Sequence, residues 1–392
     1  MSNGINHLNK PIKVAFLLIG GRQWMGGYNY LLNLLSVIKD DARIQPVLFL
    51  GNDIDKSLLL PLEKFGYKII YDDEFNSSTK HIKVAKAIIF GKNHQIEKIF
   101  LDNKIDIVFE AAMYLGWNTT IPRLSWLPDF QHRQLPYMFS KIGWIKREIV
   151  YRLIAKNRFI MLSSLDAKKD YNKFYGVPKH DLKVIPFAVK KPTINAESVD
   201  AILEKYNIKQ PYFYLPNQFW KHKNHVIAIE ALNQLKYKNS SILVVTSGHC
   251  EDARILSYCN TLKDLLDQYD VKENFHMLGS IPYEDVLSLM SLSCAVINPS
   301  LFEGWSTTVE EAKSLKVPLI LSNLSVHKEQ VEENAIFFDP NNSLELSEIL
   351  ISYECKDNGK VDYGLSQTKR LENYGDNFIG AVTSVLNKVT SI

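Results

Sequence analysis

No apolar run in this sequence is long enough to cross a bilayer. The longest runs, such as residues 14–19 (VAFLLI), fall far short of the roughly 20 apolar residues that a membrane-spanning helix needs. The N-terminal residues MSNGINHLNKPIK are polar and lack the apolar core of a signal peptide. These two absences predict a cytoplasmic protein without a membrane span.

Cysteine is scarce, and its spacing does not match the common cysteine-based sites. Cys250, Cys259, Cys294 and Cys355 are spread over the second half of the chain with no Cys-x-x-Cys pair. This pattern fits neither a disulfide framework nor a zinc site. We therefore expect four reduced thiols in a reducing compartment.

The small net charge hides an uneven distribution. The formal charge of the whole chain is +3, but residues 1–190 hold 28 Lys/Arg against 17 Asp/Glu, and the remainder holds 18 against 26. The first half therefore carries a net charge of +11 and the second half −8. Such a split indicates that the first half faces an anionic partner, although solvated faces of unequal charge are an alternative. We expect no nucleic-acid partner.

Short apolar stretches alternate with helical patterns along the whole chain. Near-continuous apolar runs, typical of buried parallel strands, occur for example at residues 13–20, 46–51, 211–216 and 241–248. Apolar residues at helical spacing lie between them, for example at 28–40, 80–91, 225–235 and 255–270. This alternation predicts an α/β fold of two doubly wound domains. We expect these domains at residues 1–190 and 195–370, with a C-terminal helix at about 371–392 packed back onto the first.

Two glutamates follow the predicted strand that ends at residue 300, in the segment PSLFEGWSTTVEEAK (299–313). Glu303 falls in a loop, and Glu311, eight residues later, falls on the following helix. Carboxylates placed in this way can bind the vicinal hydroxyls of two sugars, while Gly304 allows close backbone approach. The N–H groups of residues 306–308 can hold a diphosphate at the helix N-terminus. A capping box of Thr307 with Glu310 is the structural alternative.

A second polar loop follows the predicted strand at 211–216. Lys221, His222, Lys223 and His225 cluster there before a helix. Lysines at this place can neutralise a departing diphosphate, because their charge lies where negative charge develops. A solvated basic turn is the alternative.

The glutamate segment resembles the hallmark of family 4 retaining glycosyltransferases, which have the GT-B architecture. Glu303, Gly304, Trp305 and Glu311 match the family pattern, and the likeness continues through residues 318–331 and 335–342. The resemblance implies two facing Rossmann-like domains with a cleft between them. It also implies a nucleotide diphosphate sugar as donor and a glycan or lipid-linked acceptor. Retention at the anomeric carbon, no metal or other cofactor, and a role in surface polysaccharide synthesis are further implications of the resemblance.

The resemblance also assigns roles to individual residues. Glu303 would hold the donor sugar and Glu311 the ribose, and Lys223 matches the family's lysine. The family's arginine position falls near Asn217, which is not basic, so Lys221 is expected to substitute for it. The other donor-binding candidates are Gly304, Trp305, Ser306, Thr307 and Thr308.

In the first half, three further segments resemble this family. Gly26–Gly27 stands before a predicted helix near the donor phosphates and acceptor, with a plain turn as the alternative. The segment 126–140 contains Asp129 on the acceptor side and His132, our candidate for the histidine that reaches the donor sugar. A satisfied structural histidine is the other interpretation. Ser164 resembles the family's serine at the interdomain cleft, but helix capping explains it nearly as well.

Residues 133–158 combine seven Lys/Arg and one acid with interleaved aromatic and aliphatic residues. This pattern is typical of peripheral docking at an anionic membrane, where a lipid-linked acceptor would be met. The alternative is a helix with its apolar face on the core and a solvated basic face. Two rival functions also stay open, namely a sugar-nucleotide epimerase of the same architecture and a catalytically silent nucleotide-sugar-binding subunit.

Overall fold

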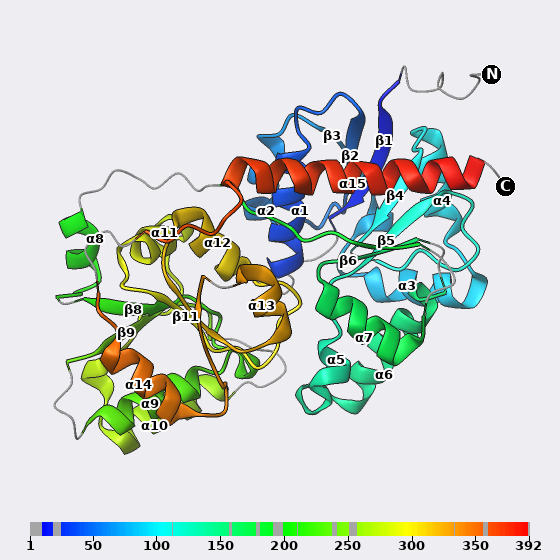
Figure 1. Cartoon of the computed structure of the whole chain (residues 1–392). Coiled ribbons are helices and arrows are strands. Elements are labelled where there is room, and N and C mark those ends of the chain that lie inside the picture. Colours follow the sequence, from blue (N-terminus) through cyan, green and yellow to red (C-terminus); the bar gives the residue numbers. More distant parts are fainter. Residues whose placement is uncertain are drawn as a thin grey trace. The chain divides into compact units, whose positions relative to one another are not determined.

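The computed structural model describes residues 10–18, 25–111, 113–156, 159–177, 181–190, 199–209, 211–236, 241–250, 257–332, 334–355 and 360–390. The chain divides into two compact units (Figure 1). Unit 1 comprises Met1–Phe130, Ile142–Ala188 and Thr368–Ile392, and unit 2 comprises Gln131–Lys141 and Val189–Gln367. The expected domain boundary, at 190–195, falls largely on residues 191–198, which lie outside the described residues.

Unit 1 is built on a seven-stranded sheet in the order β3-β2-β1-β4-β5-β6-β7. All neighbouring strands are parallel. β1 and β4 at its centre are almost wholly buried, which explains their continuous apolar sequences. The strands are β1 (Ile12–Leu17), β2 (Ile44–Leu50), β3 (Lys68–Tyr71), β4 (Ile107–Glu110), β5 (Arg123–Leu127), β6 (Phe159–Leu162) and β7 (Asp181–Val184).

The helices of the first half lie between these strands. Helix α3 ends where Gly91 adopts a left-handed conformation (φ 80°), as its sequence predicts. The helices are α1 (Met25–Val37), α2 (Lys56–Glu63), α3 (Lys80–Phe90), α4 (His94–Asp102), α5 (Gln131–Gln134), α6 (Lys141–Ile154) and α7 (Leu165–Tyr175), with short 3-10 turns η2 (Asp73–Phe75) and η3 (Pro136–Met138).

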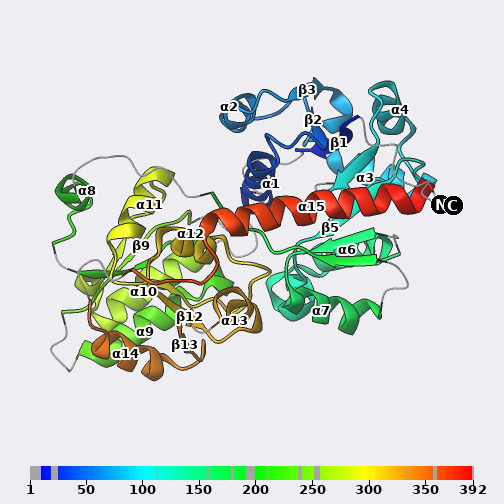
Figure 2. The same cartoon turned by 45° about the horizontal axis from the view of Figure 1, so that its top comes forward.

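The long C-terminal helix α15 (Gln367–Thr390) packs in unit 1. Figures 1 and 2 both show it lying along that unit, far in sequence from the strands that it covers. Its Phe378 ring lies 5.2 Å from the Phe109 ring of β4, and Tyr374 lies 6.3 Å from Tyr30 of α1. The buried aromatic side chains therefore join the last helix to the core of the first sheet.

Unit 2 is built on a six-stranded parallel sheet in the order β10-β9-β8-β11-β12-β13. Its strands are β8 (Tyr212–Leu215), β9 (Leu243–Thr246), β10 (Phe275–Met277), β11 (Val296–Asn298), β12 (Leu319–Ser322) and β13 (Ile336–Phe338). Its helices are α8 (Val199–Lys205), α9 (His225–Leu235), α10 (Tyr258–Tyr269), α11 (Tyr283–Leu292), α12 (Thr307–Leu315), α13 (Ser325–Val331) and α14 (Ser343–Ser352), with 3-10 turns η4 (Lys221–Lys223) and η6 (Lys272–Asn274).

Both units thus have the doubly wound order in which the first and fourth strands are neighbours. The prediction of two Rossmann-like α/β domains is confirmed, and two such units make the GT-B architecture. In a sheet of this order, ligands bind beyond the carboxyl ends of the strands where the order reverses. In unit 2 that place lies between β8 and β11. Among the helices that the structure describes, none has the length and apolarity to cross a membrane.

The expectation that the four cysteines stay unpaired is wrong for this structure. Cys250 forms a disulfide with Cys259, and Cys294 forms one with Cys355, with Cα–Cα distances of 5.7 and 5.0 Å. Linear spacing does not reveal either pair because the partners are brought together by the packing of unit 2. The 61-residue separation of the second pair spans three strands and three helices.

Candidate active site

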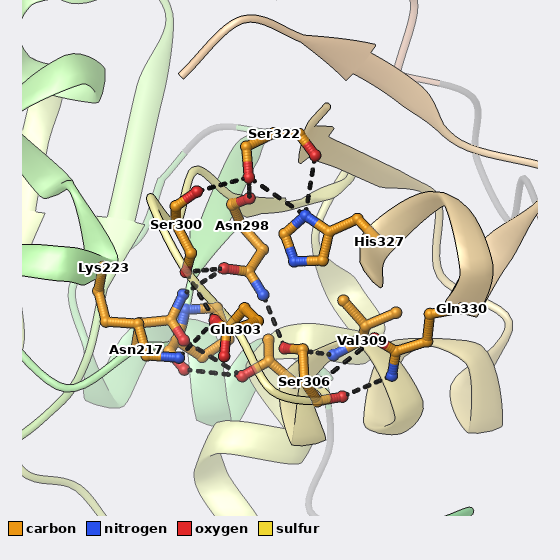
Figure 3. Close-up of polar contacts among 12 residues, drawn as sticks. Asn217, Lys223, Asn298, Ser300, Glu303, Ser306, Val309, Ser322, His327 and Gln330 are labelled. Carbon is orange, nitrogen blue, oxygen red and sulfur yellow. Dashed lines mark hydrogen bonds and ion pairs between the residues drawn. The ribbon is translucent and has the colours of Figure 1, made fainter. Parts of the chain in front are cut away.

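Polar side chains gather at the carboxyl ends of β8, β11 and β12, where unit 2 is expected to bind ligands (Figure 3). Asn217 follows β8, Asn298 ends β11, and Ser322 ends β12; all three are buried. A buried polar side chain is costly unless it is hydrogen-bonded, and each of these three is bonded to another residue of the group. The strand ends therefore carry a connected polar network rather than separate side chains.

Glu303 and Lys223 form an ion pair in this network. Lys223 Nζ lies 2.6 Å from Glu303 Oε1, and only 13% and 9% of the two side chains are exposed. The turn η4 presents Lys223. Asn224, which ends the turn, has a left-handed backbone conformation (φ 57°), and its side chain donates to the carbonyls of Pro299 and Pro340. The loop after β8 is thus tied directly to the loop after β11.

The environment of Glu303 favours its ionised form. Burial by itself would raise the pKa of this carboxyl, but the charge of Lys223 and the hydrogen bonds from Lys223 and Ser300 outweigh it, so the pKa lies below its usual range. Ser300 Oγ lies 2.6 Å from Glu303 Oε1 and 2.7 Å from Asn298 Oδ1. Because a hydroxyl has one proton, it donates to one of these two oxygens at a time.

A second layer of residues holds this loop from β12 and α13. Ser322 Oγ donates to the carbonyl of Ser300 at 2.7 Å. His327 Nδ1 lies 2.8 Å from the carbonyl oxygen of Ser322, so this nitrogen carries the proton. Burial lowers the pKa of His327 despite the nearby carboxylate of Glu303, and the ring is therefore neutral.

The start of α12 differs from the capping box that the sequence offers. Ser306, not Thr307, is the N-cap residue, and its hydroxyl accepts from the N–H of Val309. Glu310 instead accepts from Lys313 and Gln330. The capping-box alternative for Thr307 and Glu310 is therefore wrong, because the helix begins after Ser306 and places Glu310 one residue too late to reach back.

Gln330 of α13 clamps the backbone of Ser306. Its side chain accepts from the N–H of Ser306 at 3.2 Å and donates to the carbonyl of the same residue at 2.8 Å. The N–H of Ser306 is thus engaged, whereas the N–H groups of Thr307 and Thr308 precede the first intrahelical bonds of α12. The part of this N-terminus suited to an anion is consequently the pair at 307–308.

Glu311 lies on α12, eight residues after Glu303, and is 8% exposed. Its Oε1 accepts a hydrogen bond of 2.6 Å from the hydroxyl of Tyr283 on α11. Burial raises the pKa of Glu311 to about 7, and the bond from Tyr283 offsets part of that rise. The two glutamates of the motif therefore have opposite pKa shifts. Glu303 is paired with the cation Lys223, whereas Glu311 is bonded to the neutral hydroxyl of Tyr283.

The remaining donor-site candidates lie around this core. Asn217 Oδ1 accepts from Thr308 Oγ1 at 3.3 Å, so the non-basic residue is a structural link between the loop after β8 and α12. Lys221 is exposed, and its ammonium lies 5.5 Å from the centre of the Tyr137 ring. Gly304 and Trp305 are half-buried in the same loop as Glu303.

The candidates from the first half have the following positions. Gly26 and Gly27 lie inside the first turn of α1, which begins at Met25, three residues earlier than the sequence predicts. Asp129 lies near the charge of Arg147. Ser164 is the N-cap of α7 and accepts from Ala167 N. His132 is fully buried and packs against Phe139. Their proposed roles toward donor and acceptor stay predictions.

The sequence contains one Asp-x-Asp tripeptide, Asp53-Ile54-Asp55, a pattern that can bind a metal ion. Asp53 accepts from the N–H groups of Ser77 and Ser78, and Asp55 caps α2. Both carboxylates therefore have local structural roles. Among the described residues, no group of three or more His, Cys, Asp or Glu side chains is placed to hold a metal ion.

Several site residues were not singled out from the sequence, namely Asn298, Ser300, Ser322, His327, Gln330 and Tyr283. Asn298 and Ser322 could have been found, because each is the polar last residue of an apolar strand. No local pattern marks Gln330 or Tyr283, since both act on residues of another helix.

Comparisons with known proteins agree with the fold. Residues 198–374 match the family model of glycosyl transferases group 1. This match covers the part of the chain that carries Glu303 and Glu311, and the two Rossmann-like units have the GT-B architecture. The chain is 21% identical over 324 residues to the O-antigen chain mannosyltransferase RfbU of Salmonella typhimurium, covering 82% of this chain and 84% of that protein.

Two solved structures show the same fold over the whole chain. A glycosyltransferase from Rickettsia africae is 18% identical, with a TM-score of 0.65 over 98% of this chain and 97% of that one. Anabaena HepE, solved in complex with UDP-glucose, is 15% identical, with a TM-score of 0.66 over 97% of this chain and 100% of that one.

Proposed function

We propose that this protein transfers a hexosyl group from a nucleotide diphosphate sugar to a glycan or lipid-linked acceptor in surface polysaccharide synthesis, as a retaining, metal-independent enzyme of family 4. The observation that carries the proposal is the buried Glu303–Lys223 pair at the ends of β8 and β11, next to the start of α12. The likeness to an O-antigen mannosyltransferase supports the acceptor class. A neighbour that binds UDP-glucose supports the donor class.

Each group has a chemical task in this proposal. Glu303 accepts hydrogen bonds from hydroxyls of the donor sugar, and Glu311 accepts them from the ribose. The N–H groups of residues 307–308 lie at a helix N-terminus, which suits the diphosphate. Lys223 uses one N–H for Glu303, and an ammonium has three. Two donors therefore stay available for the phosphate oxygens, with Lys221 adding a second charge nearby.

The reaction exchanges one bond at the anomeric carbon. The bond from that carbon to the diphosphate oxygen breaks, and the bond to the acceptor hydroxyl oxygen forms on the same face. The acceptor proton passes to an oxygen of the departing diphosphate, which carries both electrons of the broken bond. Lys223 stabilises the charge that develops on this leaving group. His132 and Asp129 are proposed to face the donor sugar and the acceptor, respectively.

Helix α6 supports docking at the cytoplasmic face of an anionic membrane. Ile142, Ile145 and Ile149 are 67%, 51% and 44% exposed, and their spacing places them on one stripe of the helix. This stripe is additional to the inner face, where Tyr151 and Ile154 are buried. An exposed apolar stripe is the feature that distinguishes an interfacial helix from one with a purely solvated outer face.

Basic residues border the stripe. Lys141, Lys146 and Arg152 are exposed on α6, whereas the helix's acid, Glu148, is buried and bonded to Arg152 and Tyr175. The outward face therefore combines apolar and positive groups, as anionic headgroups require. Sedimentation with anionic and neutral vesicles at low and high salt tests this. Binding should need anionic lipid and weaken in Lys146→Glu, but not in Lys98→Glu on α4; equal binding to neutral vesicles would refute it.

The catalytic proposal is tested with UDP-, GDP- and dTDP-sugars. Release of nucleoside diphosphate, with transfer to a glycan or lipid-linked acceptor, is the expected result. Conversion of the donor sugar without release would identify an epimerase, and binding without turnover would identify a silent subunit. Glu303→Ala should slow release about tenfold to a hundredfold, whereas Glu348→Ala, at an exposed glutamate of α14, should leave it unchanged.

A further inference from the structure

Tyr283 makes an unusual contact for a surface tyrosine. It is the first residue of α11, after the N-cap Pro282, and 56% of it is exposed. Its hydroxyl nevertheless donates a 2.6 Å hydrogen bond to Oε1 of Glu311, which is buried on α12. Two helices are thus joined by one side-chain bond at the edge of the candidate site.

The two carboxylate oxygens of Glu311 differ in their hydrogen bonding. Oε1 accepts from Tyr283, whereas Oε2 has no hydrogen-bond partner among the described residues. Each carboxylate oxygen can accept two hydrogen bonds. Glu311 can therefore keep its bond to Tyr283 and still accept one hydroxyl on each oxygen, as a vicinal diol offers.

We propose that Tyr283 is the positioning residue that orients Glu311 toward the 2′ and 3′ hydroxyls of the nucleotide ribose. This inference rests on the proposed function, in which Glu311 binds that ribose. A glutamate side chain loses rotamer entropy when it is fixed, and a carboxylate already held by Tyr283 loses less on binding the diol. Tyr283 touches Glu311 and not the reacting atoms.

Other groups near Glu311 do not replace Tyr283. Asp285 of α11 is engaged by Lys205 and Tyr206, and these bonds outweigh burial, so its pKa stays low. The hydroxyl of Tyr214 on β8 is bonded to Ser247. On α12 itself, Glu310 pairs with Lys313. Tyr283 is thus the group that sets the direction of the Glu311 carboxylate.

The same contact has a consequence for pH dependence. Burial raises the pKa of Glu311 to about 7, and the Tyr283 bond counters that rise because it favours the charged form. Binding of the diol to the carboxylate should weaken as pH falls through this pKa. Loss of the Tyr283 hydroxyl should move that acid limb to higher pH.

A matched control exists in the same unit. Tyr206 donates a 2.5 Å hydrogen bond to Asp285 Oδ2 on α11, so Tyr206→Phe removes the same kind of bond from the same helix. Tyr283→Phe keeps the half-exposed ring and removes only the hydroxyl. Thermal unfolding of both variants checks that each retains the fold.

The experiment compares the affinities of UDP, GDP and ADP with those of their 2′,3′-dideoxy counterparts between pH 5.5 and 8.5. Wild type should prefer a ribonucleotide, and Glu311→Ala should remove the preference. In Tyr283→Phe the preference for the ribonucleotide should fall about twofold to tenfold, the effect of one hydrogen bond. The pH below which this preference weakens should also be higher than in wild type. Tyr206→Phe should change neither.

The outcomes separate this inference from the proposed function. If Glu311→Ala removes the preference but Tyr283→Phe leaves both it and the pH limb unchanged, the positioning role of Tyr283 is overturned alone. If wild type shows no ribose preference, or Glu311→Ala leaves it intact, the ribose role of Glu311 fails and this inference with it.

Discussion

Removing Lys223 should produce two separable losses, one of stability and one of catalysis. Lys223→Ala leaves Glu303 buried beside Ser300 without its cation. A similar pair in unit 1 provides the control. Lys83 Nζ lies 2.6 Å from Glu74 Oε1, with 12% and 14% of these side chains exposed, and Glu74 also accepts from Asn93.

The size of the stability loss follows from this burial. Removing one partner of a buried pair typically costs about 3–5 kcal/mol. Because both pairs keep a slight exposure and a second hydrogen-bond donor, we expect the lower end, about 3 kcal/mol, for Lys223→Ala and Lys83→Ala alike. Adding Glu303→Gln to Lys223→Ala should recover part of this loss, since no uncompensated charge then stays buried.

The pH dependence of this loss has a definite sign. The pKa of Glu303 lies below its usual range in the folded protein, so the pair stabilises the fold above the unfolded pKa, and this contribution is lost as pH falls through the folded pKa. Without Lys223, burial dominates and the pKa of Glu303 rises. The destabilisation in Lys223→Ala should therefore be larger at pH 8 than at pH 5.

Urea unfolding followed by tryptophan fluorescence measures the stability, and steady-state kinetics measure the catalysis. Lys223→Ala should lower kcat by about a hundredfold or more, the effect of removing one group that stabilises developing charge. It should also weaken binding of a nucleoside diphosphate more than that of the nucleoside. Lys83→Ala should leave both unchanged. Equal kinetic losses in the two variants, or equal loss of affinity for nucleoside and diphosphate, would refute the assignment.

Three further predictions concern the rest of unit 2. Glu303→Ala and Glu311→Ala should each lower kcat/KM for the donor about tenfold to a hundredfold in steady-state assays, with the fold intact; loss of stability alone would contradict their roles. Because burial raises the pKa of Glu311 to about 7, its stabilising contribution fades as pH rises through that value. Glu311→Gln should therefore be stabilised relative to wild type more at pH 8 than at pH 5 in urea unfolding. Cys355→Ser should lower stability by about 4 kcal/mol under oxidising conditions, the loop entropy of a 61-residue separation, and should match wild type once a reductant is present.

The alternation of apolar runs and helical patterns was enough to predict two doubly wound sheets. A strand buried on both faces needs a continuous apolar sequence, and β1 and β4 have one. Local signals also predicted some helix ends correctly. Gly91, for example, marks the C-terminus of α3. The start of α1 was predicted three residues late because Gly26 and Gly27 were placed before the helix, whereas the helix already includes them.

The motif of Glu303 and Glu311 was visible in the sequence because both residues belong to one loop-helix segment. Their environments were not visible. Lys223 lies 80 residues from Glu303, and Tyr283 lies 28 residues from Glu311. Burial, an ion pair and a single hydroxyl give the two carboxyls opposite pKa shifts, and each of these depends on which strands and helices become neighbours.

The same division applies to the rest of the chain. Local sequence determined which segments form strands and helices, because backbone hydrogen bonding and the periodicity of apolar residues act over a few positions. Tertiary structure decided that Ser306 caps α12 while Gln330 is hydrogen-bonded to its backbone. It also decided that Cys294 forms a disulfide with Cys355. These contacts join residues that are distant in sequence. Their geometry exists only after the strands of unit 2 have taken their order in the sheet.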